Sequence, residues 1–129
     1  MRETVIAMSE EMLVAFATEW VAAWNAHDLE RILELYEPEF EFSSPVLAKR
    51  IPESRGHLRG KAAARVYWSA AFAPGVNLRF EHVATLVGVG SLVIHYKGLR
   101  GKLCAEFFEF GASGKVSRSY AHECQQNVP

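Results

Sequence analysis

The chain has 129 residues, of which half are hydrophobic and 22% are charged. This length matches one domain, and the composition is typical of globular proteins rather than of disordered ones. Fourteen basic against fifteen acidic residues leave a formal charge of -1, so no overall positive field attracts a nucleic acid. We therefore expect a single domain over residues 1–129 that does not bind nucleic acid, with residues 1–9 as a flexible N-terminal extension.

The hydropathy pattern and the N-terminus predict a cytoplasmic protein. The first eight residues include Arg2 and Glu3 and hold no apolar stretch long enough for a signal peptide. No segment approaches the ~20 apolar residues that a membrane helix needs. The two cysteines, Cys104 and Cys124, lack the spacing of metal ligands, and we expect both to be reduced.

The N-terminal half is predicted to be largely helical. From residue 10 to residue 25 the apolar side chains recur at steps of three and four, as in a one-sided helix. Asp28 is suited to cap a second helix, whose apolar stripe runs from Leu29 to Tyr36. The helical period returns over residues 61–73, which predicts a third helix.

A strand and a long loop are predicted between the second and third helices. Residues 39–44 alternate between apolar and polar side chains, which is typical of a strand. Residues 45–60 show no period, and we expect them to form a surface loop. Its basic residues could form a local anion-binding patch, but Pro52 and Gly56 interrupt them, and we prefer a solvated loop.

The C-terminal half is predicted to be an antiparallel meander. Four alternating runs, at residues 76–87, 91–97, 102–110 and 115–123, are separated by glycine-containing turns. Three helices and such a sheet share one core only if the sheet curls around the helices. We therefore expect an α+β fold in which three N-terminal helices pack on a curled, mostly antiparallel sheet, a cone-shaped α+β roll.

This cone predicts two kinds of partner. Its wide end is a concave place suited to a small hydrophobic molecule. The outer face of the sheet keeps apolar residues in alternation, and such exposed patches mark interfaces, so we expect a homodimer.

Three segments carry a family resemblance. WVAAWNAHDLERILELYEPEFEF, LRGKAAARVYW and AEFFEFGASGKVSR resemble, in order and spacing, the nuclear-transport-factor-2-like superfamily, especially its SnoaL-like and ketosteroid-isomerase-like branches. The resemblance implies the same curled roll with a pocket, and it also implies a dimer. Fold is a weak guide to chemistry, so the function has to be argued from individual positions.

The ketosteroid-isomerase-like pattern is only partly kept. It implies a phenolic oxyanion donor where this chain has Trp20, and a catalytic carboxylate where it has Ser44. The third acidic position of the pattern is occupied by Glu106. A supporting tyrosine is matched by Tyr36, and a second one is replaced by Trp68.

The polyketide-cyclase-like pattern also lacks its acid. Members of the SnoaL-like branch with that activity carry an acid/base aspartate on the last strand, where this chain has Ala121 between Tyr120 and His122. The resemblance therefore implies a shared pocket without either complete set of catalytic groups.

Glu106 is the leading candidate for chemistry. It stands in an apolar run, and alternation places it on the same face as Cys104 and Phe108. Burial on that face would raise the pKa of the carboxyl and suit it to general acid/base work near neutral pH. The alternative is that Glu106 points to solvent and that Glu109, on the other face, takes the inside.

The five histidines show no metal-ligand spacing, and we expect neither a metal nor another cofactor. His95 and His122 fall on strands that could approach Glu106, and a His–Glu pair is a workable proton relay. The alternative for each is a histidine satisfied by a backbone hydrogen bond.

Aromatic residues are the candidates for ligand binding. Indole and phenol groups combine an apolar body with a polar atom that needs a partner. The alternative is that they are plain core, and that Trp20 and Trp68 fill the pocket instead of lining it. The candidate ligand-binding residues are Trp20, Tyr36, Trp68, Phe108 and Tyr120.

Two functions remain open on the sequence. The first is a cofactor-independent isomerase, dehydratase or cyclase that uses Glu106 as general acid or base on a hydrophobic, oxygenated substrate. The second is a non-catalytic module that binds a ligand or a second copy of the chain.

Overall fold

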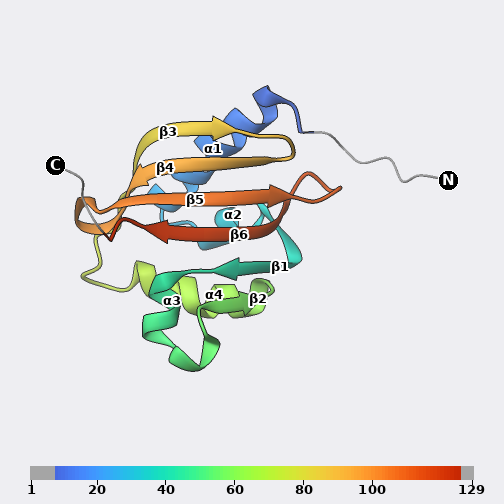
Figure 1. Cartoon of the computed structure of the whole chain (residues 1–129). Coiled ribbons are helices and arrows are strands. Elements are labelled where there is room, and N and C mark those ends of the chain that lie inside the picture. Colours follow the sequence, from blue (N-terminus) through green and yellow to red (C-terminus); the bar gives the residue numbers. More distant parts are fainter. Residues whose placement is uncertain (1–7, 126–129) are drawn as a thin grey trace.

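The computed structural model describes residues 8–125 (Figure 1). Helices and strands alternate in the first half, and a four-stranded meander makes up the second half. The helices are α1 (Glu10–Asn25), α2 (Leu29–Leu33), α3 (Pro45–Arg50) and α4 (Lys61–Ser69), with short 3-10 turns η1 (Pro52–Ser54), η2 (Ala70–Phe72) and η3 (Leu99–Gly101). The strands are β1 (Tyr36–Ser43), β2 (His57–Arg59), β3 (Glu81–Val87), β4 (Ser91–Lys97), β5 (Leu103–Phe110) and β6 (Val116–Glu123).

The first helix follows its sequence pattern. The Ser9 hydroxyl caps α1 by accepting a hydrogen bond from the Met12 N–H, so Ser9 belongs to the fold. Of the predicted N-terminal extension, residues 1–7 lie outside the described residues. The apolar stripe of α1 is buried against the sheet through Leu13, Phe16, Ala17, Trp20, Ala23 and Trp24.

The second helix is shorter than predicted. Asp28 caps it as expected, because its Oδ1 accepts the Arg31 N–H at 3.1 Å. The helix ends at Leu33, however, and Tyr36 begins β1 instead of closing the helix. Pro38 explains the early switch, since a proline and the residue before it both disfavour helical backbone.

The predicted loop over residues 45–60 is wrong in part, because it contains α3, η1 and β2. Ser44 caps α3 by accepting the Val46 N–H at 3.1 Å, and Pro45 occupies the first turn, where its missing N–H costs nothing. The three residues of β2 pair with β1, with Glu41 opposite Arg59. These elements are too short to show a period, and β2 exists only through its pairing.

The sheet has six strands in the order β2-β1-β6-β5-β4-β3. The meander β3 to β6 is antiparallel, as predicted. The pairing of β1 with β6 is parallel and joins the two halves of the chain, with Phe42 beside Ser119. The strand predicted over residues 76–87 begins only at Glu81, because Asn25 of α1 binds the N–H and C=O of Phe80.

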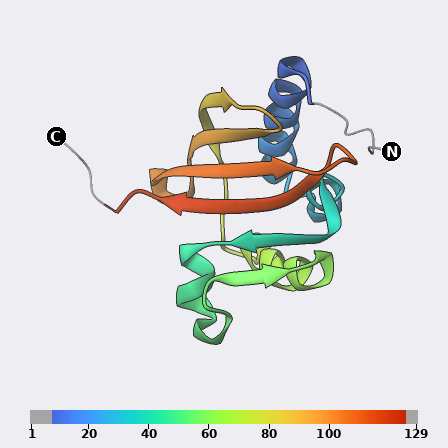
Figure 2. The same cartoon turned by 45° about the vertical axis from the view of Figure 1, so that its right-hand side comes forward.

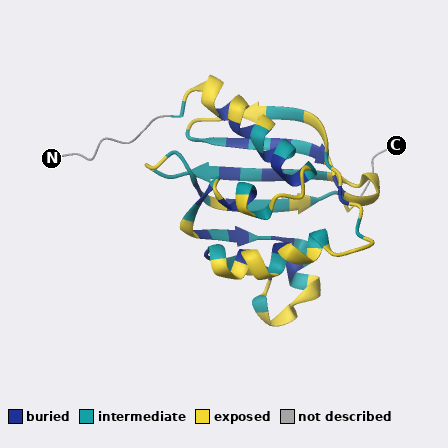
Figure 3. Cartoon of the chain, turned by 180° about the vertical axis from the view of Figure 1, so that it is seen from behind, coloured by how far each residue is buried: buried dark blue, intermediate teal, exposed yellow. Residues whose placement is uncertain are grey.

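The helices and the sheet form two layers. Figures 1 and 2 show α1, α2 and α4 on one side of the curled sheet, and Figure 3, seen from behind, shows buried residues in both the helices and the strands. Among the described residues, no helix lies on the opposite face of the meander. The α+β roll predicted from the sequence is confirmed. Within residues 8–125 no helix has the length and hydropathy needed to cross a membrane.

Candidate functional site

A cavity of about 440 Å³ opens between the sheet and the helices. Three segments meet at its mouth: the turn between β4 and β5, the end of β6, and α3 with the residue before it. Figure 1 shows these segments at the same end of the sheet, on the left. The wall is mostly apolar and aromatic, which suits a hydrophobic ligand.

The tryptophans line this cavity and leave it open. Trp20 and Trp68 are both among its lining residues. The Trp20 indole is fixed by its stack on Phe80, with ring centroids 5.4 Å apart, and by donating from Nε1 to the Tyr36 hydroxyl at 3.0 Å. Tyr36 was predicted to bind a ligand, but it is completely buried and does not line the cavity. Its hydroxyl instead holds the Trp20 indole in place.

Glu106 lies on the cavity wall from β5. Alternation turns Glu106 inward with Phe108, and its neighbour across the ladder to β6 is Ala121. The residue is only 4% exposed, and burial raises the pKa of its carboxyl from the ordinary 4.5 to about 8. The burial and raised pKa expected from the sequence are both found. Glu109 lies on the other face, as its odd spacing from Glu106 requires.

Tyr96 is a site residue that the sequence analysis missed. Its hydroxyl donates to Glu106 Oε1 at 3.3 Å, and this bond opposes the effect of burial by lowering the pKa of the carboxyl. Burial in turn raises the pKa of the Tyr96 phenol well above its ordinary value, with the charge of Glu106 as a further cause. Alternation in β4 turns Tyr96 inward with Leu92 and Ile94, and that signal could have identified it.

The two positions at which the family resemblance implies acids also face the cavity. Ser44 and Ala121 both line it. The Ser44 hydroxyl accepts backbone N–H groups of α3 and is therefore committed to capping. Tyr67 lies beside it; burial raises the pKa of Tyr67, and a hydrogen bond with Ser44 and the charge of Arg50 lower it.

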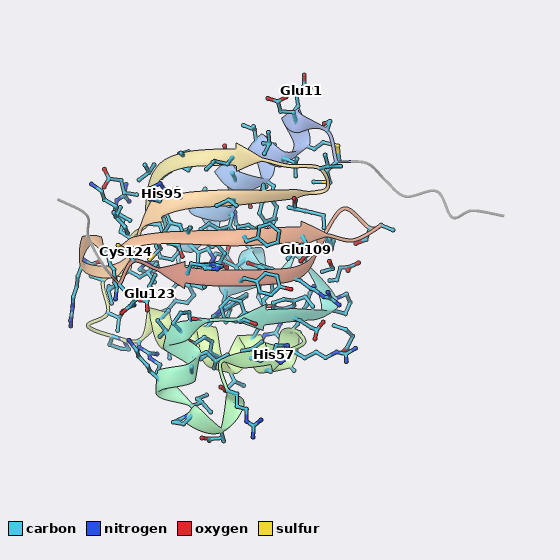
Figure 4. The ribbon with its side chains drawn as sticks, viewed as in Figure 1. Glu11, His57, His95, Glu109, Glu123 and Cys124 are labelled. Carbon is cyan, nitrogen blue, oxygen red and sulfur yellow. The ribbon has the colours of Figure 1, made fainter. Side chains whose placement is uncertain are left out.

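The predicted His–Glu relay is not assembled inside the cavity. His95 does not line it, because alternation in β4 turns Tyr96 inward and leaves His95 on the outer face. Figure 4 labels His95 on that strand. His122 is exposed at the rim, where its Nδ1 is hydrogen-bonded to the Tyr120 carbonyl oxygen at 3.0 Å. Both histidines are thus kept away from the Glu106 carboxyl by the pleat of the sheet.

Two of the predicted ligand-binding aromatics also lie off the cavity. Phe108 is fully buried in the core, in edge contact with Phe16 and Trp20, and does not line the opening. Tyr120 lies on the outer face, with its ring centroid 5.8 Å from that of Phe107. Trp24 was not among the candidates, yet it lines the cavity and its buried indole N–H has no acceptor among the described residues.

The mouth carries most of the charge. Arg50 comes from the end of α3, Arg100 and Lys102 come from the turn between β4 and β5, and Glu123 comes from the end of β6. Figure 4 shows Glu123 at this end of the sheet. Lys102 Nζ lies 3.6 Å from Glu123 Oε2.

The described residues contain no group of three or more His, Cys, Asp or Glu side chains arranged to hold a metal ion. Cys104 lines the cavity, and burial raises the pKa of its thiol, which disfavours the reactive thiolate. Cys104 and Cys124 are not joined by a disulfide. Among the described lining residues, Glu106 and Tyr96 form a hydrogen-bonded pair of ionisable groups inside the cavity.

Comparison with known proteins agrees with this architecture. Residues 17–119 match the SnoaL-like domain family. A SnoaL-like protein of unknown function from Burkholderia thailandensis is 41% identical and superposes with a TM-score of 0.87, over 92% of this chain and 99% of that chain. A comparison with curated proteins gave no match.

More distant solved structures share the fold alone. A candidate ketosteroid isomerase from Kribbella flavida is 16% identical with a TM-score of 0.69, over 92% of this chain and 82% of that chain. The epoxide hydrolase/cyclase-like enzyme SalBIII, described in pyran ring formation in polyether salinomycin, is 14% identical with a TM-score of 0.74, over 92% and 95%. The fold thus occurs with different assigned chemistries.

Proposed function

Because the chain belongs to the SnoaL-like domain family, we propose that it is a small-molecule pocket protein, and that it acts as a cofactor-independent enzyme in which Glu106 moves a proton on a hydrophobic, oxygenated ligand. The reaction class is isomerisation, dehydration or cyclisation. Structural neighbours assigned as ketosteroid isomerase and as epoxide cyclase-like enzyme support this range.

One observation carries the proposal: a buried carboxyl with a pKa of about 8 in an apolar cavity. Near neutral pH both of its protonation states are accessible, which general acid/base catalysis requires. As a carboxylate it is a stronger base than a free glutamate, and as a neutral acid it donates a proton to a ligand oxygen. Tyr96 positions the carboxyl and limits the rise of its pKa.

The simplest step that fits is proton transfer next to a carbonyl group. The Glu106 carboxylate takes a proton from the carbon, and the electron pair of that C–H bond moves toward the carbonyl oxygen to give an enolate. In a β,γ-unsaturated ketone the enolate is conjugated with the C=C bond, and return of the proton to the far carbon of that bond completes an isomerisation. In a β-hydroxy ketone the electron pair of the enolate forms a C=C bond as the C–O bond breaks, and transfer of the proton to the departing hydroxyl group releases water and completes a dehydration. The apolar wall excludes water and so protects the enolate from unproductive protonation.

Deuterium exchange tests this step without knowledge of the natural substrate. Cyclic and aromatic ketones are incubated with the protein in D₂O between pH 5 and pH 9, and exchange at the carbon next to the carbonyl is followed by NMR. We expect exchange above the buffer rate, and a loss of about 10²- to 10⁴-fold in Glu106→Gln. Glu109→Gln, the same change on the other face of β5, should retain the rate of the unmodified protein.

The pH profile identifies the active form. A rate that rises with pH through the pKa of Glu106 indicates the carboxylate as base, and a rate that falls indicates the neutral acid. Equal exchange in Glu106→Gln and in the unmodified protein at every pH would remove Glu106 from the mechanism.

A non-catalytic binding module is the second candidate. It is favoured by Ser44 and Ala121, which stand at the positions where the family resemblance implies acids. In that case ketones would raise the melting temperature of the protein by mass action without any exchange above the buffer rate.

We also propose a homodimer formed through the outer face of the meander. No helix of residues 8–125 covers that face (Figure 1), and it presents half-buried apolar side chains at its centre. They include Val93, Ala105, Phe107 and Tyr120.

A further inference from the structure

We propose that the ligand of this cavity is a hydrophobic carboxylate, whose apolar body lies along the aromatic wall and whose carboxylate group lies at the mouth against Arg50 and Arg100. The inference deepens the proposed function and rests on it in concerning the same cavity, but it is carried by the charges at the mouth and not by proton transfer at Glu106. It can therefore fail or succeed independently of proton transfer.

The mouth brings together cations from distant parts of the chain. Arg50 is the last residue of α3, whereas Arg100 and Lys102 flank the end of η3, and all three line the cavity with exposed side chains. Within residues 8–125 neither Arg50 nor Arg100 forms an ion pair, although Arg31, Arg59, Arg65 and Arg118 all do. Both guanidinium groups are thus available to a ligand.

The charge balance of the lining favours an anion. Against Arg50, Arg100 and Lys102 the described lining residues include two carboxyl groups, those of Glu106 and Glu123. Glu123 already pairs with Lys102 at 3.6 Å, and Glu106 is buried deeper and is mostly neutral at pH 7 because its pKa is about 8. The mouth therefore keeps about two positive charges that no group among the described residues offsets.

Arg50 acts on the wall of this same cavity. The charge of Arg50 lowers the pKa of Tyr67, and only burial and the hydrogen bond with Ser44 have larger effects on that pKa. Tyr67 lines the cavity, so the guanidinium lies within electrostatic reach of its interior. Of the basic residues between positions 49 and 61, Arg50 therefore contributes to the cavity, which the expectation of a solvated loop did not include.

The fold sets the length of the ligand. Lys102 and Glu106 are four residues apart on one extended segment, which spans about 13 Å along the strand. A ligand that reaches from the mouth to Glu106 therefore extends along this stretch of β5.

Arginine favours a carboxylate in this setting. The guanidinium presents a planar fork of N–H donors that matches the two oxygens of a carboxylate, and these charge-assisted bonds are stronger than neutral ones. The mostly apolar wall adds burial of a hydrocarbon body, which a polyphosphate or a small inorganic ion does not offer.

A matched pair of probes tests the proposal. We would measure the binding of 6-phenylhexanoate and of its uncharged amide by calorimetry at pH 7 in about 0.15 M NaCl. We expect the carboxylate to bind about tenfold more tightly than the amide, since hydrogen bonds to charged groups are the strong ones. Affinity for the carboxylate should fall as the salt concentration rises, whereas affinity for the amide should not.

Single substitutions locate the head group. Arg50→Gln and Arg100→Gln should each weaken carboxylate binding about 3- to 10-fold and change amide binding less than about twofold. Lys49→Gln is the matched control, because it removes one charge from the adjacent, exposed position of α3, which does not line the cavity. Circular dichroism of each variant would establish that α3 and the sheet are retained.

The outcomes separate this inference from the proposed function. Equal affinity for the carboxylate and the amide, no binding of either probe at millimolar concentration, or equal losses in Lys49→Gln and Arg50→Gln would overturn it. Glu106→Gln should keep the preference for the carboxylate. Failure of deuterium exchange together with a retained carboxylate preference would reject the enzyme and leave the anion site in place.

Discussion

The Tyr96 hydroxyl lies 3.3 Å from Glu106 Oε1, inside a cavity whose wall is otherwise mostly apolar. The two residues come from neighbouring antiparallel strands, with Tyr96 directly opposite Cys104 and therefore diagonal to Glu106. The phenol donates a hydrogen bond to the carboxyl and so lowers the pKa of Glu106, whereas burial raises the same pKa. This pair determines how the site responds to pH.

The first prediction concerns that response. In Tyr96→Phe the carboxylate loses its donor while burial persists, so the pKa of Glu106 should rise above about 8. A ¹³C NMR titration of the glutamate carboxyl carbons would measure it. Tyr120→Phe, on the outer face, is the control and should leave the titration unchanged. An unchanged or lowered pKa in Tyr96→Phe would contradict the assigned role of Tyr96.

The second prediction links Glu106 to folding. Below pH 4.5 its carboxyl is protonated in both states; as the pH rises toward 8 the unfolded chain ionises while the folded protein keeps the proton. The free energy of unfolding should therefore fall across this window, by up to roughly 5 kcal/mol. Glu106→Gln should lose this decline and be more stable than the unmodified protein above pH 8.

Urea denaturation at a fixed protein concentration, repeated at several pH values, measures this difference. Glu109→Gln serves as the control, because that carboxyl lies on the other face of β5. Parallel stability curves for the unmodified protein and Glu106→Gln would show that Glu106 titrates normally in the folded protein.

The third prediction concerns the bond between Trp20 and Tyr36. Both side chains are fully buried, and the indole N–H donates to the phenol oxygen at 3.0 Å. Tyr36→Phe leaves the N–H without an acceptor and should cost about 1–3 kcal/mol of stability. Trp20→Phe also leaves a void and should cost about 2–4 kcal/mol.

The double variant Trp20→Phe/Tyr36→Phe distinguishes pairing from packing. It removes both polar partners at once, so its loss should be smaller than the sum of the two single losses. Val66→Ala is the control, since that side chain is 77% exposed and should change stability by less than about 0.5 kcal/mol. Strict additivity would indicate that the hydrogen bond contributes nothing beyond the packing of each ring.

The fourth prediction concerns the proposed homodimer. Phe107→Glu places a charge at the centre of the outer face and should convert a dimer into a monomer in sedimentation experiments at micromolar concentration. Val89→Glu introduces the same group at the fully exposed turn between β3 and β4 and should leave the assembly intact. A monomer already in the unmodified protein would reject the dimer.

The sequence alone determined the features that depend on local periodicity. Apolar spacing predicted α1 and the meander, Asp28 was identified as a cap, and alternation turned Glu106 inward. These are properties of a single helix or strand, because the period of the backbone fixes which side chains share a face. The raised pKa of Glu106 could be predicted as well, because its apolar neighbours in the sequence indicated that the carboxyl is buried.

The tertiary structure decided whatever depends on pairing between distant segments. The parallel pairing of β1 with β6 and the short strand β2 have no local signal in the sequence. The eight residues of β1 and the three residues of β2 do not indicate which strand each of them pairs with. The partner of Glu106, the exclusion of His95 from the cavity and the arrival of Arg50 at its mouth follow from register and curl. Periodicity assigns each residue to a face, but only the packed sheet and helices decide which faces enclose the same space.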